Sequence, residues 1–190
     1  MILDDIALSA ELAALPTSWE HVDDQRPAAV LAPIFAREGE DWLLFTERRA
    51  DLPLHPGQIS FPGGAREADE DPVACARRES AEEVGLQTES VELLGALPNH
   101  TSTSLFRVHT IVGRIGDPEN LKPNPREVAS IFAVPFAELL VDDRWEEREY
   151  DTTVRRYGPS PHFVHERHLI WGLTGRLTRE LLAAVGRSEV

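Results

Sequence analysis

The chain of 190 residues has little cysteine, no long apolar run and no excess of basic residues. Its single cysteine, Cys75, excludes an internal disulfide and a metal site made of several thiolates, and we interpret it as a small packing residue. No apolar run approaches the roughly 20 residues of a membrane-spanning helix, and the start MILDDIALSAELAALP lacks the basic residues of a signal peptide. A net charge of −14 argues against a nucleic-acid partner. We therefore expect a cytoplasmic protein without membrane or nucleic-acid partners.

The length and the hydrophobic content of 42% favour one globular domain over residues 1–190. Apolar spacing predicts a helix at 5–15, ended by Pro16, as an addition before a core at about 28–180. Strands and helices interleave without strict alternation, which favours an α+β class with a mixed sheet. The expected strands are 28–38, 42–48, 58–61, 91–97, 106–115 and 127–135, with an edge hairpin from 148–158 and 162–168 and a helix at 170–185.

The most informative stretch is FPGGAREADEDPVACARRESAEEVGL, residues 61–86. A turn is expected at its Pro-Gly-Gly sequence, followed by a helix that begins near Asp71 and ends at Gly85. On this helix Glu79, Glu82 and Glu83 fall within an arc of about 100°. Three carboxylates on one face suit a hard divalent cation such as Mg²⁺ or Mn²⁺, although the same spacing also occurs on solvated helices.

The spacing around these glutamates is more specific than the glutamates alone. Gly64 is followed after five residues by Glu70, and seven further residues lead to Arg78-Glu79, then Glu82-Glu83, Gly85 and Leu86. This resembles the Nudix box, G-x5-E-x7-R-E-U-x-E-E-x-G-U, in which U is a bulky apolar residue. Ser80 departs from the pattern at the first U, which predicts some loss of helix packing. The resemblance implies a Nudix-type α/β/α sandwich with a mixed β-sheet.

The resemblance to the Nudix family also implies roles for the matched positions. Glu79, Glu82 and Glu83 would be the metal ligands, with Mg²⁺ or Mn²⁺ as the cofactor. Arg78 would orient a glutamate, and Glu70 would tie the loop to the helix. Gly64 would permit the tight loop before the helix, and Gly85 would form the C-terminal cap of the helix. A proton acceptor is also required for hydrolysis, and the candidates are Glu82, Glu83 and the more distant Glu127.

A second resemblance concerns the substrate. The stretch LFTERRADLPLHPGQISFPGG, residues 44–64, resembles the upstream signature of coenzyme A pyrophosphatases, approximately LLTxR[SA]x3Rx3Gx3FPGG. Arg49 and Pro53 depart from it. The resemblance implies hydrolysis of coenzyme A or its thioesters to 4′-phosphopantetheine (or its acyl form) and adenosine 3′,5′-bisphosphate. The substrate-binding residues would be Arg48, His55, Gln58, Gly63 and Gly64.

Two other functions remain open at this point. The substrate could instead be ADP-ribose, NADH or another nucleoside diphosphate derivative, because Pro53 replaces an expected arginine. A catalytically silent nucleotide-binding domain is disfavoured because the glutamates of the box are all present. A zinc site from His162, His165 and His168 is also disfavoured, since a strand would point the middle one away from the others. The sequence does not indicate an oligomeric state.

Overall fold

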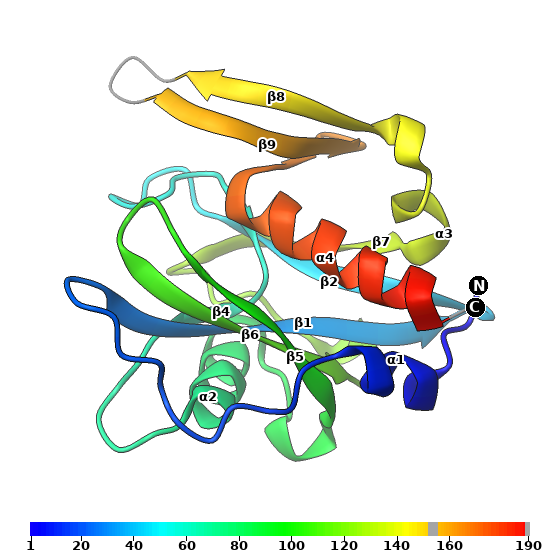
Figure 1. The fold of residues 1–190 in the computed structure, drawn as a ribbon, viewed down its shortest axis with the longest axis horizontal. Coiled ribbons are helices and arrows are strands. Elements are labelled where there is room, and N and C mark those ends of the chain that lie inside the picture. The colour runs from blue at the N-terminus through cyan, green and yellow to red at the C-terminus, as the bar shows by residue number, and fades with distance from the viewer. Residues whose placement is uncertain (152–155, 189–190) are drawn as a thin grey trace.

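A seven-stranded mixed sheet runs through the middle of the molecule in the computed structural model, which describes residues 1–151 and 156–188 (Figure 1). The strand order is β3-β2-β1-β6-β5, with β4 beside β1 and β7 beside β2. The strands are β1 (Arg26–Arg37), β2 (Glu40–Arg48), β3 (Ile59–Ser60), β4 (Gly63–Ala65), β5 (Glu92–Thr101), β6 (Phe106–Arg114) and β7 (Val128–Pro135).

Strand β1 organises this sheet because it has three neighbours. It runs parallel to β6 along one edge, from Arg26 opposite Phe106 to Ile34 opposite Arg114. Its other edge is divided: the end near Ile34 pairs with β2, and Ala28–Val30 pairs with β4, both antiparallel. The mixed sheet that the sequence predicts is therefore confirmed. The division of this edge places the two glycines of β4 at the end of the sheet.

Helices cover both faces of the sheet, as Figure 1 shows. On one face lies α2 (Pro72–Val84), which buries Cys75, Ala76 and Val84 against β1 and β6. On the other face lie α1 (Asp5–Glu11) and α4 (Gly172–Ser188), around a core that includes Phe45, which stacks on Phe61 at 5.1 Å between ring centroids. The α/β/α sandwich is thus confirmed. The remaining short helices are α3 (Phe136–Leu139) and three 3₁₀ turns at Thr88–Ser90, Pro118–Asn120 and Asp142–Arg144.

A second sheet of three strands stands beside α4 (Figure 1). It consists of β8 (Trp145–Asp151), β9 (Arg156–His165) and β10 (His168–Ile170), all antiparallel, with β9 in the middle. The predicted edge hairpin is wrong in its bounds: residues 159–161, expected as its turn, lie inside β9, and the expected strand 162–168 runs from β9 into β10. Residues 152–155 of the predicted hairpin lie outside the described residues.

Two further predictions are corrected by long-range pairing. The helix expected at 5–15 ends at Glu11, because the backbone of Ala13 exchanges two hydrogen bonds of 3.0 Å with Ala96 of β5. The expected turn at Pro62-Gly63-Gly64 is instead the entry to β4, whose residues pair with β1. Among the described residues, no helix is long and apolar enough to cross a membrane.

The bounds predicted for α2 are confirmed. Asp71 precedes the helix, and its side chain accepts a hydrogen bond of 2.8 Å from the Ala74 amide. Pro72 occupies the first helical position, where its missing N–H costs no helical hydrogen bond. Gly85 ends the helix with φ of 70°, a left-handed conformation that glycine adopts without strain.

Candidate active site

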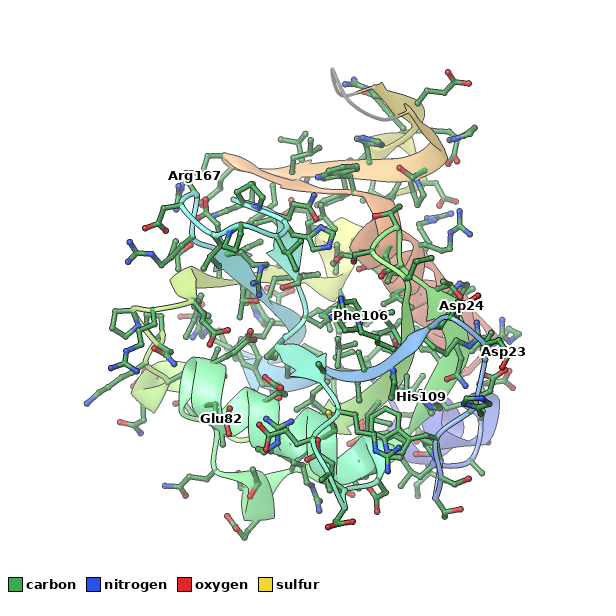
Figure 2. All side chains as sticks on the ribbon, turned by 90° about the vertical axis from the view of Figure 1, so that its left-hand side faces the viewer. Asp23, Asp24, Glu82, Phe106, His109 and Arg167 are labelled. Carbon is green, nitrogen blue, oxygen red and sulfur yellow. The ribbon has the colours of Figure 1, made fainter. Side chains whose placement is uncertain are left out.

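A cavity of about 770 Å³ lies at the end of the first sheet where β4 and α2 meet, a size that suits a small-molecule ligand. Its walls come from α2 and β4, from the loop that contains His55, from the loop at residues 100–104, and from β9 with the start of α4. Figure 2 looks onto this side of the molecule, with Glu82 on α2 and Phe106 nearer the centre; both line the cavity. The cavity therefore unites segments from nearly the whole chain.

Glu83 is the most deeply buried of the three box glutamates, with 3% of its surface exposed. Its Oε2 accepts a hydrogen bond of 3.1 Å from the amide of Gly63, and its Oε1 lies 3.7 Å from Nη1 of Arg48. Burial raises the pKa of Glu83 to about 7, and the Gly63 hydrogen bond and the Arg48 charge offset only part of this effect. Burial therefore dominates, and this carboxyl group keeps its proton more tightly than an exposed glutamate does.

Glu79 lies against Gly64 so closely that the glycine has no room for a side chain. A Cβ atom at Gly64 would overlap the carboxylate of Glu79. Burial raises the pKa of Glu79, and the charges of Glu82 and Glu127 add to the increase, while Arg78 opposes it. The fit between β4 and α2 therefore fixes where this carboxylate lies.

Arg78 connects the helix to the loop before it. Its Nε and Nη2 donate to the two oxygens of Glu70 at 3.0 and 2.9 Å, a two-pronged pair that lowers the pKa of Glu70 to about 2. Its Nη1 donates to Glu79 at 3.0 Å and to Glu82 at 3.4 Å, and its Nη2 also donates to the Ala65 carbonyl. Arg78 thus holds Glu70, β4 and two box glutamates together.

Glu127 reaches the site from a loop that is attached to the end of α2. The amide of Asn124 donates to the Glu83 carbonyl at 2.7 Å, and the Glu127 carbonyl accepts from the Arg49 amide at 2.9 Å. The Glu127 side chain lines the cavity, and its charge raises the pKa of both Glu79 and Glu83. No described residue donates a hydrogen bond to its exposed carboxylate.

The residues of the upstream signature lie beside the box glutamates in the same cavity. Arg48, His55 and Gln58 all line it, and the backbone carbonyl of Gln58 accepts from the Arg48 amide at 2.9 Å. His55 and Ser104 form a hydrogen bond of 2.9 Å between two loops, and burial lowers the pKa of His55. The structure therefore brings all five predicted substrate-binding residues to one cavity.

The chemistry of these side chains fits a divalent cation, although their present contacts do not form a ligand set. Carboxylate oxygens are the donors that Mg²⁺ and Mn²⁺ prefer. Burial is the main cause of the raised pKa values of Glu79 and Glu83, and the charge of Glu127 adds to both, so a cation among these carboxylates would favour their ionised forms. Within residues 1–151 and 156–188, no three histidine, cysteine or acidic side chains are grouped closely enough to hold one ion. The reason is local: Arg78 holds Glu79 and Glu82, and Arg48 and Gly63 hold Glu83.

Among the described residues, the three histidines considered for zinc do not gather into one group of ligands. His162 stacks on Trp171, His165 bonds to Glu138 at 2.8 Å, and His168 stacks on Phe132 with ring centroids 3.8 Å apart. His165 of β9 is paired with His168 of β10, and both rings stack on Phe132, whereas His162 lies three residues earlier on β9. These contacts are those of packing residues.

Cys75 and Ser80, the two other small residues singled out on α2, are buried within the helix packing. Burial raises the pKa of the Cys75 thiol to about 12, so it is not a reactive thiolate. Ser80 is fully buried, and its hydroxyl donates to the Ala76 carbonyl at 2.7 Å. The departure of Ser80 from the box pattern thus leaves no unsatisfied hydroxyl.

Other residues of the cavity were not predicted from the sequence. Phe106 and Trp171 line it, and so does Arg176 near the start of α4. The sequence gives Phe106 the pattern of an ordinary strand residue, and Trp171 and Arg176 that of an amphipathic helix start. Only the pairing of distant segments brings them to the cavity.

The family of the chain follows from its match to the NUDIX domain over residues 25–156. The chain belongs to the Nudix hydrolase family, whose members act on nucleoside diphosphate derivatives and generally use divalent metal ions such as Mg²⁺ or Mn²⁺.

The chain is similar to an uncharacterized Nudix hydrolase NudL of Pectobacterium atrosepticum, with 37% identity over 168 residues that cover 88% of this chain and 86% of the relative. It is similar to a NudL of Citrobacter koseri, with 36% identity over 98% of this chain and 96% of the relative. Its fold is similar to that of the Nudix hydrolase RenU of M. smegmatis, with a TM-score of 0.52 and 22% identity over 68% of this chain and 81% of that structure. Neither NudL name states a substrate.

Proposed function

We propose that the protein hydrolyses the pyrophosphate bond of coenzyme A or its thioesters, giving adenosine 3′,5′-bisphosphate and 4′-phosphopantetheine or its acyl form. One observation carries the proposal: the signature residues Arg48, His55 and Gln58 line the same cavity as the box glutamates of α2. The sequence resemblance to coenzyme A pyrophosphatases and the position of the signature beside the box thus support the same substrate.

In this proposal Glu79, Glu82 and Glu83 hold Mg²⁺ or Mn²⁺. Bound divalent ions would neutralise charge on the phosphate oxygens and make water more acidic there. The three carboxylates can reach a common ion only by leaving part of their present contacts with Arg78, Arg48 and Gly63. The positive charge of the cation would also oppose the effect of burial on Glu83 and lower its pKa.

The remaining residues position the substrate and receive the proton. Arg48 lines the cavity 3.7 Å from Glu83, and its guanidinium suits a phosphate oxygen of the diphosphate. Glu127 is the proton acceptor that we favour over Glu82 and Glu83. Its carboxylate faces the cavity and has no described hydrogen-bond donor, whereas Glu82 and Glu83 are both engaged.

The experiment that tests the proposal is chromatographic product analysis with Mg²⁺ or Mn²⁺ and four parallel substrates: coenzyme A, dephospho-coenzyme A, ADP-ribose and NADH. We expect coenzyme A to be cleaved fastest, with adenosine 3′,5′-bisphosphate and 4′-phosphopantetheine as products. Faster cleavage of ADP-ribose or NADH would refute coenzyme A as the substrate but would still agree with a Nudix hydrolase. No turnover of any substrate would favour a silent nucleotide-binding domain.

The same assay tests the role of Glu127. Glu127→Gln is expected to lower kcat by about 100- to 10,000-fold, the usual contribution of a positioned base. Glu119→Gln is the control, since Glu119 is an exposed acid of the preceding loop and does not line the cavity. If Glu127→Gln keeps full activity, Glu127 is not the proton acceptor, and Glu82 or Glu83 is the remaining candidate.

A further inference from the structure

We propose that the wall of the cavity formed by α4 binds a second phosphate group of the substrate, a phosphate monoester remote from the hydrolysed diphosphate, and that Arg176 is the residue that binds it. The inference rests on the proposed function in taking the substrate to be a nucleoside diphosphate derivative. It goes further by stating which end of the cavity determines specificity.

The positive charges of the cavity are few, and most are already engaged. Among the residues whose side chains are described, three arginines line it: Arg48, Arg78 and Arg176. Arg78 is bound to Glu70, Glu79 and Glu82, and Arg48 is paired with Glu83. Both lie beside carboxylates of α2, where they serve the box and the hydrolysed diphosphate rather than a second, distant anion.

Arg176 differs because it makes no hydrogen bond or ion pair with any residue that the structure describes. Among the lysines and arginines with described side chains, only Lys122 and Arg126 also lack an acidic, aromatic or carbonyl partner, and neither lines the cavity. In a chain with a net charge of −14, acidic partners are plentiful. An exposed guanidinium without one, on the wall of a ligand-sized cavity, is placed to bind an anionic ligand group.

The position of Arg176 places this anion away from the box. Helices α2 and α4 cover opposite faces of the first sheet (Figure 1), yet residues of both line the one cavity. The strands of the layer between them contribute the apolar side chains Val30, Phe106 and Val108 to its lining. A ligand that binds at α2 through its diphosphate and at Arg176 through a second phosphate would pass its uncharged part over this apolar surface.

The test compares substrates that differ by one phosphate monoester. Coenzyme A and dephospho-coenzyme A differ only in the 3′-phosphate. We expect Arg176→Ala to lower kcat/KM for coenzyme A by roughly 10- to 100-fold, as for loss of a charged hydrogen-bonded pair, and to change that for dephospho-coenzyme A by less than about twofold. Arg176→Lys should recover part of the loss. Lys122→Ala, which removes another unpaired cation outside the cavity, should change neither value.

Equal losses on both substrates would overturn the proposal, and so would unchanged activity on both. Failure of the proposed function is distinguishable, because it is measured on the wild-type protein as poor cleavage of coenzyme A relative to ADP-ribose. In that case calorimetry compares the affinities of wild type and Arg176→Ala for adenosine 3′,5′-bisphosphate and AMP, which differ only in the 3′-phosphate, and it needs no turnover. Tighter binding of the bisphosphate that is lost in Arg176→Ala supports the inference, and equal binding of the two nucleotides refutes it.

Discussion

Replacing Glu83 with glutamine should stabilise the metal-free protein at neutral and alkaline pH while it abolishes catalysis. The carboxylate is buried, and its pKa is about 7 compared with an ordinary value of 4.5. Because the native state keeps this proton more tightly than the unfolded chain, Glu83 makes the protein less stable as the pH rises from about 4.5 to about 7. Above pH 7 the loss is complete.

A difference of this size between the two pKa values lowers the free energy of unfolding at alkaline pH by about 3 kcal/mol relative to acidic pH. Glutamine has the same shape, and its oxygen can still accept from the Gly63 amide. It carries no charge and so avoids the cost of burying one. At pH 8 we therefore expect Glu83→Gln to be more stable than the wild type by up to about 3 kcal/mol, with little difference at pH 5.

The assay is urea unfolding in the presence of EDTA at several pH values between 5 and 8, with circular dichroism as the probe. Glu82→Gln is the matched control, because the Glu82 side chain is 57% exposed and its charge remains solvated in the folded protein. Added Mg²⁺ or Mn²⁺ should reverse the order at pH 8, since the ion stabilises only the protein with its carboxylate. A stability difference between wild type and Glu83→Gln that stays the same at pH 5 and pH 8 would refute this reasoning.

The other predictions concern the contacts around α2. Gly64→Ala should lower kcat on the order of 100-fold with the fold retained in circular dichroism, because the added methyl group displaces the Glu79 carboxylate; wild-type kcat would contradict the contact. Glu70→Gln should destabilise the protein at pH 7, where the ionised Glu70 is paired with Arg78. Since the pKa of Glu70 is about 2, the difference in free energy of unfolding between wild type and Glu70→Gln should become smaller as the pH falls from 5 to 3. A difference that stays constant in urea unfolding would exclude the Glu70–Arg78 pair as its source.

Local sequence signals were sufficient to predict α2. Asp71, Pro72 and Gly85 set its two ends by capping and by backbone preference, which depend only on near neighbours in the chain. The spacing of the box then predicted which glutamates share a face. Glu79, Glu82 and Glu83 all line the cavity that the structure forms.

Features that depend on distant segments were not predictable in this way. The stretch Gly63–Ala65 has little preference for a strand, and it becomes one only because β1 offers it a free edge. Likewise the sequence could not indicate that Arg48 lies beside Glu83, or that Arg176 lines the same cavity as the box. Each of these relations is set by sheet pairing between segments far apart in the chain.

The parallel pairing of β1 with β6 has a consequence for the order in which the protein can mature during synthesis. Parallel neighbours need a long connection, and here that connection contains β2, the loop of His55, the whole of α2 and β5. The apolar face of α2 packs on β1 and β6 together, so its support is complete only after Arg114 has been made. A nascent chain that stops before Phe106 contains every residue of the Nudix box and still has no site.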